Sequence, residues 1–171
     1  MESPQDESER FIAATGEPAE YTAQILRSAE LTDGLTPAQQ ARLAAIGQLR
    51  SYAPGVLICD EHEQSDEVYI IGSGAVEVWL DPLNVGQDGG QPRRIAVLQA
   101  RQTCGELALL DGGVRSARLR AGPNGARLVA LRHAALIALC EADTAIGFCV
   151  MRNLAASLAL RLRLQDMRLY E

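Results

Sequence analysis

The sequence predicts an α+β fold in which an antiparallel β-barrel or sandwich is flanked by helices. The chain has 171 residues and is 47% hydrophobic, which suits one globular domain with a modest core. Residues 21–46 and 132–166 contain apolar residues at helical spacing. Residues 50–131 contain short alternating segments, separated by glycine and polar residues, which are typical of an antiparallel roll. We therefore expect residues 19–171 to form a single domain.

The part of the chain before the roll predicts a polar tail and two helices. Residues 1–18 are acidic and polar, so we expect them to be disordered. Residues 21–31 have the spacing of a short amphipathic helix. A second helix is predicted over 37–46, because Thr36 can cap its start and Gln39 completes a capping box.

Six segments of the central region predict strands, and three connections between them predict turns or loops. Ser73-Gly74 predicts a hairpin turn, AGPNGA at 121–126 another turn, and residues 82–92 a longer flexible loop. The predicted strands cover residues 56–59, 68–72, 75–80, 94–99, 117–121 and 127–131.

The C-terminal part predicts a short helix over 132–142 and a longer one over 144–166, with Asp143 as its cap. An apolar stripe on the longer helix can serve core or dimer packing, or it can cover a ligand. These roles can coexist on different faces of one helix. The stripe consists of Phe148, Met151, Leu154, Ala155, Leu158, Leu162 and Gln165.

The net charge and its distribution along the chain indicate what the chain can bind. All sixteen basic residues are arginines, and the formal net charge is −6, which disfavours general nucleic-acid binding. The first 100 residues hold six arginines and sixteen acids, whereas residues 101–171 hold ten arginines and six acids, so the second part can attract an anion.

The four cysteines contain no C-x-x-C pair, so we expect reduced, mostly buried thiols and no zinc site. The polar N-terminus has no signal-peptide pattern, and no apolar run approaches the ~20 residues of a membrane span, so we expect a cytoplasmic protein.

The stretch CGELALLDGGVRSARLRA, residues 104–121, carries the strongest chemical signal. Glu106 stands inside an apolar run, where a carboxylate is costly to bury without a partner. Gly105 permits close backbone approach, and the amides of Leu107 and Ala108 would lie at a helix start, where an anion is favoured.

Two further residues of this stretch can complete a receptor. Arg115 follows a glycine pair, and its planar fork suits two phosphate oxygens. Ser116 adds a hydroxyl to the same group, while Glu106 can accept from a sugar hydroxyl. The spacing therefore predicts a site for a sugar joined to a phosphate.

This stretch resembles the phosphate-binding cassette of cyclic nucleotide-binding domains, the family of the catabolite activator protein and the protein kinase A regulatory subunits. The resemblance extends from about Gly34 to Gln165. It implies a β-roll, jelly-roll-like, with N-terminal helices and a C-terminal helical lid. This sequence departs from the family pattern at three positions, which are Cys104 for an aromatic residue, Val114 for proline and His62 for a turn glycine.

The resemblance also implies a role for each residue of the site. Glu106 would accept from the ribose 2′-hydroxyl, and Arg115 would pair with the cyclic phosphate. Ser116 would bond to the phosphate or to a base edge, and Ala117 would lead into the next strand. Gly105, Leu107 and Ala108 would line the phosphate pocket. Arg161 is a candidate lid residue that stacks on the purine, and Arg152, Asn153 and Ser157 are weaker candidates.

The implied function is a sensor of cAMP, or else cGMP, that needs no metal and is not an enzyme. Ligand binding would reposition the C-terminal helix and so act on a partner or effector protein. Because the chain ends near the long helix, we expect no direct DNA binding by it. A homodimer along that helix is possible. The alternative is a ligand-free dimerisation or interaction module of the same fold, with Glu106 and Arg115 as an internal ion pair.

Overall fold

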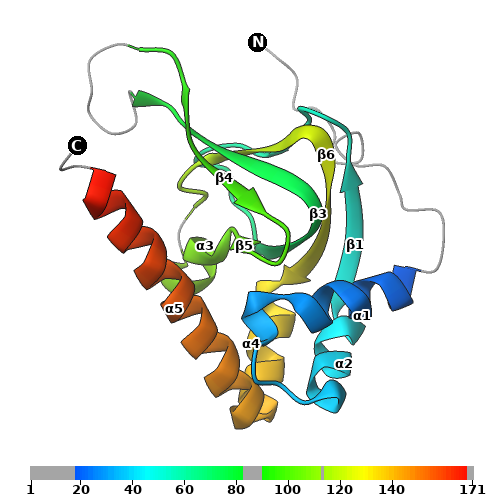
Figure 1. Ribbon diagram of the computed structural model, residues 1–171. Coiled ribbons are helices and arrows are strands. Elements are labelled where there is room, and N and C mark those ends of the chain that lie inside the picture. Colours follow the sequence, from blue (N-terminus) through cyan, green and yellow to red (C-terminus); the bar gives the residue numbers. More distant parts are fainter. Residues whose placement is uncertain (1–17, 83–89, 113, 169–171) are drawn as a thin grey trace.

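The molecule consists of a sheet with helices gathered at one end, and the long C-terminal helix runs from that end along one side of the sheet (Figure 1). The computed structural model describes residues 18–82, 90–112 and 114–168. Residues 1–17 of the predicted tail and most of the loop predicted over 82–92 lie outside these residues, whereas Pro18, the last residue of the predicted tail, begins the first helix. The helical elements are α1 (Pro18–Ser28), η2 (Glu30–Thr32), α2 (Pro37–Ala45), α3 (Glu106–Asp111), α4 (His133–Ala142) and α5 (Thr144–Arg168).

In the described part of the chain, six antiparallel strands make one sheet, which confirms the predicted α+β class. The sheet order is β1-β6-β3-β4, with β2 paired to β6 and β5 paired to β3. The strands β1 and β5 were not predicted, because neither has an alternating apolar pattern. The strands are β1 (Gly47–Tyr52), β2 (Leu57–Cys59), β3 (Glu67–Leu80), β4 (Arg93–Gln99), β5 (Thr103–Cys104) and β6 (Arg118–Arg132).

Two of the predicted turns are wrong, because β3 and β6 each run straight through them. The register between these strands passes from Val76↔Ala121 to Gly74↔Ala126, so the glycine-rich segment 122–125 is a bulge opposite Ala75. A Cβ atom on Gly74 would overlap the carbonyl of Gly125, which shows how closely the two backbones approach. The glycines therefore allow strand contact here and do not end the strands.

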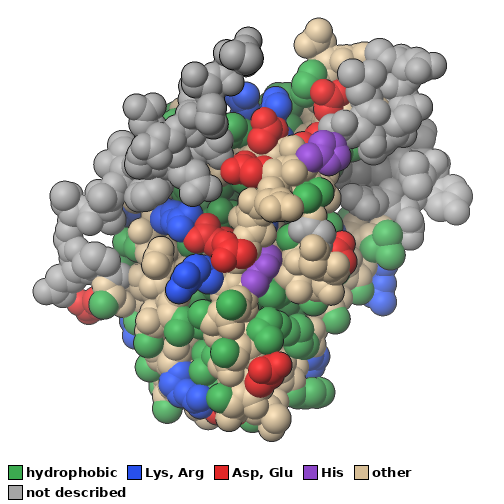
Figure 2. Space-filling model, turned by 180° about the vertical axis from the view of Figure 1, so that it is seen from behind, with side chains coloured by type: hydrophobic (Ala, Val, Ile, Leu, Met, Phe, Trp, Pro, Cys, Tyr) green, Lys and Arg blue, Asp and Glu red, His purple; other side chains and the backbone are tan. Residues whose placement is uncertain are grey.

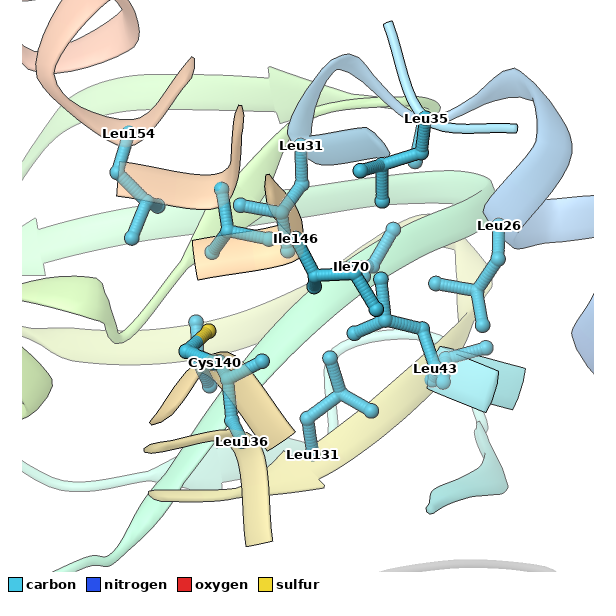
Figure 3. Close-up of a cluster of buried hydrophobic side chains, with 14 of the residues drawn as sticks. Leu26, Leu31, Leu35, Leu43, Ile70, Leu131, Leu136, Cys140, Ile146 and Leu154 are labelled. Carbon is cyan, nitrogen blue, oxygen red and sulfur yellow. The ribbon is translucent and has the colours of Figure 1, made fainter. Parts of the chain in front are cut away.

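The buried hydrophobic side chains of the described residues form two clusters, one between the helices and the sheet and one within the sheet. One joins the helices to the adjoining part of the sheet through residues such as Leu26, Leu43, Ile70 and Ile146 (Figure 3). The second cluster packs residues of the sheet against one another. Seen from behind, hydrophobic side chains cover much of the surface at the helical end, whereas acidic side chains gather farther up (Figure 2). The second cluster contains Tyr52, Ile58, Cys59, Tyr69, Ile71, Val76, Leu98, Cys104, Leu119, Ala121, Ala126, Leu128 and Ala130.

The start of α2 confirms the predicted capping box. The Thr36 hydroxyl accepts from the Gln39 amide at 3.3 Å, and the Gln39 side chain accepts from the Thr36 amide at 3.0 Å. We expect Thr36→Ala to lower the free energy of unfolding by about 1 kcal/mol, because it leaves a helix-end amide without its acceptor. Urea denaturation measures this loss. Thr36→Ser is the control, since it keeps the hydroxyl, and an equal loss in both variants would contradict the capping role.

Two sides of α5 meet different surroundings. Ile146, Val150 and Leu154 are buried in the helical cluster, after Asp143 caps the helix through the amides of Ala145 and Ile146. Of the predicted apolar stripe, Leu154 is buried in this cluster, whereas Phe148, Ala155 and Leu162 are exposed.

The N-terminal half of α5 is also tied to η2. The side-chain amide of Asn153 donates to the carbonyls of Leu31 at 2.9 Å and Asp33 at 2.8 Å. The 21-residue stretch Thr144–Leu164 is long and apolar enough to cross a membrane by length and composition alone. The expectation that no apolar segment approaches the length of a membrane span is therefore wrong by length and composition. Ile146, Val150 and Leu154 of this stretch are buried in the helical cluster, and most of its other residues are not buried.

Candidate functional site

A cavity of about 370 Å³ lies between the sheet, α3 and α5. All eight residues that the sequence singled out line it, which are Gly105, Glu106, Leu107, Ala108, Arg115, Ser116, Ala117 and Arg161. Its remaining wall is almost entirely apolar and comes from β3, β4, β5, β6 and α5. These wall residues are Val78, Ile95, Ala96, Leu98, Cys104, Leu119, Leu158 and Leu162.

The turn from β5 into α3 forms one end of the cavity. Gly105 has a φ of 79°, in the left-handed region, so a side chain here would strain the backbone. Its missing Cβ also leaves space for Arg115, whose Cζ would lie 3.0 Å from a Cβ at this position. Since α3 begins at Glu106, the amides of Leu107 and Ala108 lie in its first turn, where N–H groups have no intrahelical partner.

Arg115 is 2% exposed and is held by oxygen atoms that carry no formal charge. Its Nη1 donates to the Gly105 carbonyl at 2.9 Å, and its Nη2 donates to the Ser65 hydroxyl at 2.5 Å and the Glu67 carbonyl at 2.7 Å. The guanidinium carbon lies 5.2 Å from the centre of the Tyr69 ring. Among the residues that the structure describes, no carboxylate forms a salt bridge with Arg115. A buried cation without a carboxylate partner strongly favours the binding of an anion.

Glu106 is 4% exposed and is paired with α5, not with Arg115. The Nη1 atom of Arg161 donates to its Oε1 at 2.7 Å, and the Nη2 atom donates to the carbonyl of Thr103. The internal Glu106–Arg115 ion pair of the alternative hypothesis is therefore not formed. The guanidinium of Arg161 is thus paired with the carboxylate, and its stacking on a purine stays a prediction.

Three polar atoms beside this cavity are buried without a hydrogen-bond partner in the described part of the chain. They are Oε2 of Glu106, Nε of Arg115 and Nε of Arg161. A buried polar atom without a partner costs about 1–3 kcal/mol, and more when the group is charged. One hydrogen-bond acceptor and two cationic donors around a single cavity match a ligand that carries both a hydroxyl and an anionic group.

Other predicted residues divide between the cavity and its surroundings. Ser116 is exposed at the cavity wall, where its hydroxyl is open to a ligand. Of the weaker lid candidates, Arg152 and Asn153 bind the carbonyl of Asp33 instead. The three weaker lid candidates, Arg152, Asn153 and Ser157, do not line the cavity.

The residues that contact the Arg115 guanidinium from β3 and the segment before it, and most of the apolar wall, were not predicted from the sequence. Val78 could have been found from the alternation of its strand, and Leu158 from its place three residues before Arg161 on a helix. Ser65 and Tyr69 give no such signal, because they are about fifty residues away from Arg115 in the chain.

Two of the departures from the family pattern, Cys104 and His62, are explained by their surroundings and backbone conformation. Burial raises the pKa of the Cys104 thiol, so this residue is a neutral part of the wall. His62 is exposed with a φ of 64°, a conformation that glycine adopts without strain. Cys59, Cys104 and Cys140 are buried free thiols, as predicted, whereas Cys149 is half-buried.

Comparisons with known proteins agree with this geometry. The family model "Cyclic nucleotide-binding domain" matches residues 49–143. The chain is 32% identical over 148 residues to "Cyclic AMP receptor protein" of Thermus thermophilus, covering 84% of this chain and 62% of that protein.

Solved structures share the fold. The structure of Thermus thermophilus Catabolite Activator Protein has a TM-score of 0.69 and 33% identity, over 82% of this chain and 62% of that one. A cyclic nucleotide-binding domain from Methylobacillus flagellatus has a TM-score of 0.74 and 23% identity, over 88% and 81%.

This chain thus spans less than two thirds of the two Thermus proteins. The family match covers more than half of the chain and includes the whole cassette stretch from Gly105 to Ala117. By this match and by its cavity, the chain belongs to the cyclic nucleotide-binding domain family.

Proposed function

We propose that this chain is a regulatory domain that binds cAMP, and cGMP more weakly, and that it is not an enzyme. Glu106 accepts a hydrogen bond from the ribose 2′-hydroxyl, and Arg115 binds the cyclic phosphate. Gly105 and the first-turn amides of Leu107 and Ala108 line the phosphate end. Ser116 bonds to the phosphate or to a base edge, and Ala117 continues the wall into β6.

The observation that carries this proposal is the set of partnerless atoms around one cavity. The free Oε2 of Glu106 suits a hydroxyl donor, and the free Nε of Arg115 suits a phosphate oxygen. Both residues are almost fully buried, so neither can satisfy these atoms with bulk water at little cost. A ribose joined to a cyclic phosphate supplies both partners at once.

The base is held by the apolar wall. Ile95, Leu98 and Leu119 from the sheet face Leu158 and Leu162 from α5 across the same cavity, which suits the flat apolar faces of a purine. The preference for cAMP rests on the relative from Thermus thermophilus, whose name is "Cyclic AMP receptor protein".

Binding is transmitted through α5 to an effector protein. The helix is fixed to the core through Ile146, Val150 and Leu154, and it reaches the cavity through Arg161. A ligand that binds Glu106 changes the contacts of Arg161, and it can shift the position of α5 by no more than its differential affinity for the two positions.

The exposed face of α5 is the proposed dimer contact. Phe148, Ala155 and Ala159 are exposed, and their separations of seven and four residues fit a helical seam. A homodimer in the cytoplasm, with its effector bound beside this seam, is the arrangement we propose.

Isothermal titration calorimetry with cAMP and cGMP tests the binding function. We expect one nucleotide per chain and tighter binding of cAMP. If neither nucleotide binds at millimolar concentration, the binding function is wrong and the ligand-free interaction module is favoured. Sedimentation of the same samples reports whether the chains form dimers.

Arg161→Gln is expected to weaken cAMP binding about tenfold, because a hydrogen bond to a charged group contributes about 1.5–3 kcal/mol. The variant removes the cation that orients the Glu106 carboxylate. Calorimetry measures the change. Arg163→Gln is the matched control, since Arg163 is exposed on the same helix and does not line the cavity. Equal affinities of the two variants would contradict the role of Arg161.

A further inference from the structure

The connection between β2 and β3 holds both the backbone and the side chain of Arg115. The amide of His62 donates to the Arg115 carbonyl at 2.9 Å, and the amide of Arg115 donates to the Glu63 carbonyl at 3.0 Å. The same connection supplies the Ser65 hydroxyl to Nη2, and β3 supplies the Glu67 carbonyl. A segment about fifty residues away therefore determines where this arginine lies.

The hydrogen bonds of Arg115 also determine which of its donors remain for a ligand. A guanidinium has five N–H groups in a fixed plane. Ser65 and Glu67 use both N–H groups of Nη2, and Gly105 uses one of Nη1. The Nε–H is left without a protein partner, and it points in a different direction from the second N–H of Nη1. If Ser65 did not hold Nη2, the plane could turn and present a different donor to the anion.

Glu67, whose carbonyl binds Arg115, is itself held by a network of hydrogen bonds. Arg50 binds the Glu67 carboxylate with both of its terminal nitrogens, and the Nη1–Oε2 distance is 2.7 Å. The Tyr69 hydroxyl donates to the same carboxylate at 3.0 Å, while the Tyr69 ring lies against the Arg115 guanidinium. This network fixes the start of β3 to β1, so the Glu67 carbonyl is a fixed acceptor and Ser65 is the adjustable one.

We propose that Ser65 is a positioning residue, whose hydroxyl fixes the plane of the Arg115 guanidinium so that the Nε–H faces the anionic group of the ligand. This assignment rests on the proposed function. Serine suits this role because its hydroxyl accepts a hydrogen bond without neutralising the arginine. The charge of Arg115 therefore stays available to the ligand.

The test uses cAMP and its two phosphorothioate diastereomers, in which sulfur replaces one or the other exocyclic phosphate oxygen. The wild-type chain is expected to distinguish the diastereomers, because a fixed guanidinium contacts one of these oxygens in preference. Ser65→Ala is expected to weaken cAMP binding about tenfold and to bring the two diastereomer affinities closer together. Ser65→Thr keeps the hydroxyl and is expected to restore the preference.

Ser51→Ala is the matched control, since Ser51 is a half-buried serine on β1 that does not line the cavity. An unchanged diastereomer ratio in Ser65→Ala would overturn the assignment. An equal loss for all three ligands with a lower melting temperature would overturn it too, because that result indicates a purely structural role. Failure of the wild-type chain to bind any of the ligands would instead overturn the proposed function, and the assignment with it.

A double-mutant cycle provides an independent measurement. Lysine has no planar fork to orient, so in the Arg115→Lys background Ser65→Ala is expected to change cAMP affinity less than about twofold. The same tenfold loss in both backgrounds would show that Ser65 acts independently of Arg115 and would overturn the assignment.

Discussion

Arg115→Ala is expected to weaken cAMP binding by about 10- to 100-fold, which corresponds to the loss of charge-assisted hydrogen bonds worth about 1.5–3 kcal/mol. The variant removes the buried cation of the cavity, and in the described part of the chain no carboxylate is paired with that cation. The same change leaves the Ser65 hydroxyl and the carbonyls of Gly105 and Glu67 without their donor. Calorimetry measures the affinity, and thermal unfolding measures the accompanying loss of stability.

Arg120→Ala is the control for this experiment. Arg120 is also an arginine close to the cassette stretch, but it is exposed on β6 and does not line the cavity. We expect this variant to bind cAMP as the wild-type chain does. Wild-type affinity in Arg115→Ala, with the chain still folded, would exclude Arg115 as the phosphate ligand.

Gly105→Ala is expected to abolish most of the binding as well, at least about tenfold, by displacing the guanidinium of Arg115. A Cβ here would overlap Nη1, and it would lie 3.0 Å from Cζ and 3.2 Å from the Glu67 carbonyl oxygen. Because Ser65 and Glu67 also bind the guanidinium, it cannot move away from the Cβ without losing those bonds. The positive φ adds a cost of about 1–2 kcal/mol to folding.

Gly112→Ala separates the two effects of that substitution. Gly112 ends α3 with a φ of 67°, but a Cβ on it would have no atom within 4 Å. Both variants are therefore expected to lose similar stability in urea denaturation, and Gly105→Ala alone is expected to lose cAMP affinity. A similar loss of affinity in both would indicate that backbone strain, and not contact with Arg115, disturbs the site.

The candidate site was largely predictable because most of it lies in one short stretch of the chain. Gly105, Glu106 and Arg115 are within eleven consecutive residues, and the local turn from β5 into α3 brings them together. Arg161 was predicted at the site from its helix, but its partner was not. Pairing with Glu106 depends on how α5 lies over the sheet, which no local pattern in the sequence expresses.

The strands were less predictable because a glycine can either end a strand at a turn or allow close backbone contact between two strands. Gly74 and Gly125 both have a positive φ and suggest turns when each is read alone. In the fold they lie against each other in neighbouring strands, where a side chain on either one would meet the other strand or β1. Only the pairing of β3 with β6 distinguishes close backbone contact from a change of direction.

The support behind Arg115 could not be predicted, since it depends on register. Ser65 and Tyr69 lie beneath the arginine because β3 pairs with both β5 and β6. Neither residue type signals binding by itself, and the Arg50–Glu67 pair joins two strands that are neighbours only through β6.

The outward side of α5 has a consequence for how such a domain can evolve. Leu154, which anchors the helix, and Arg161, which reaches the cavity, are seven residues apart and lie on one side of it, whereas Phe148 is exposed on another side. Mutations on the outward side can therefore create contacts with a new effector while the receptor stays intact. One inherited nucleotide pocket can in this way come to govern unrelated outputs.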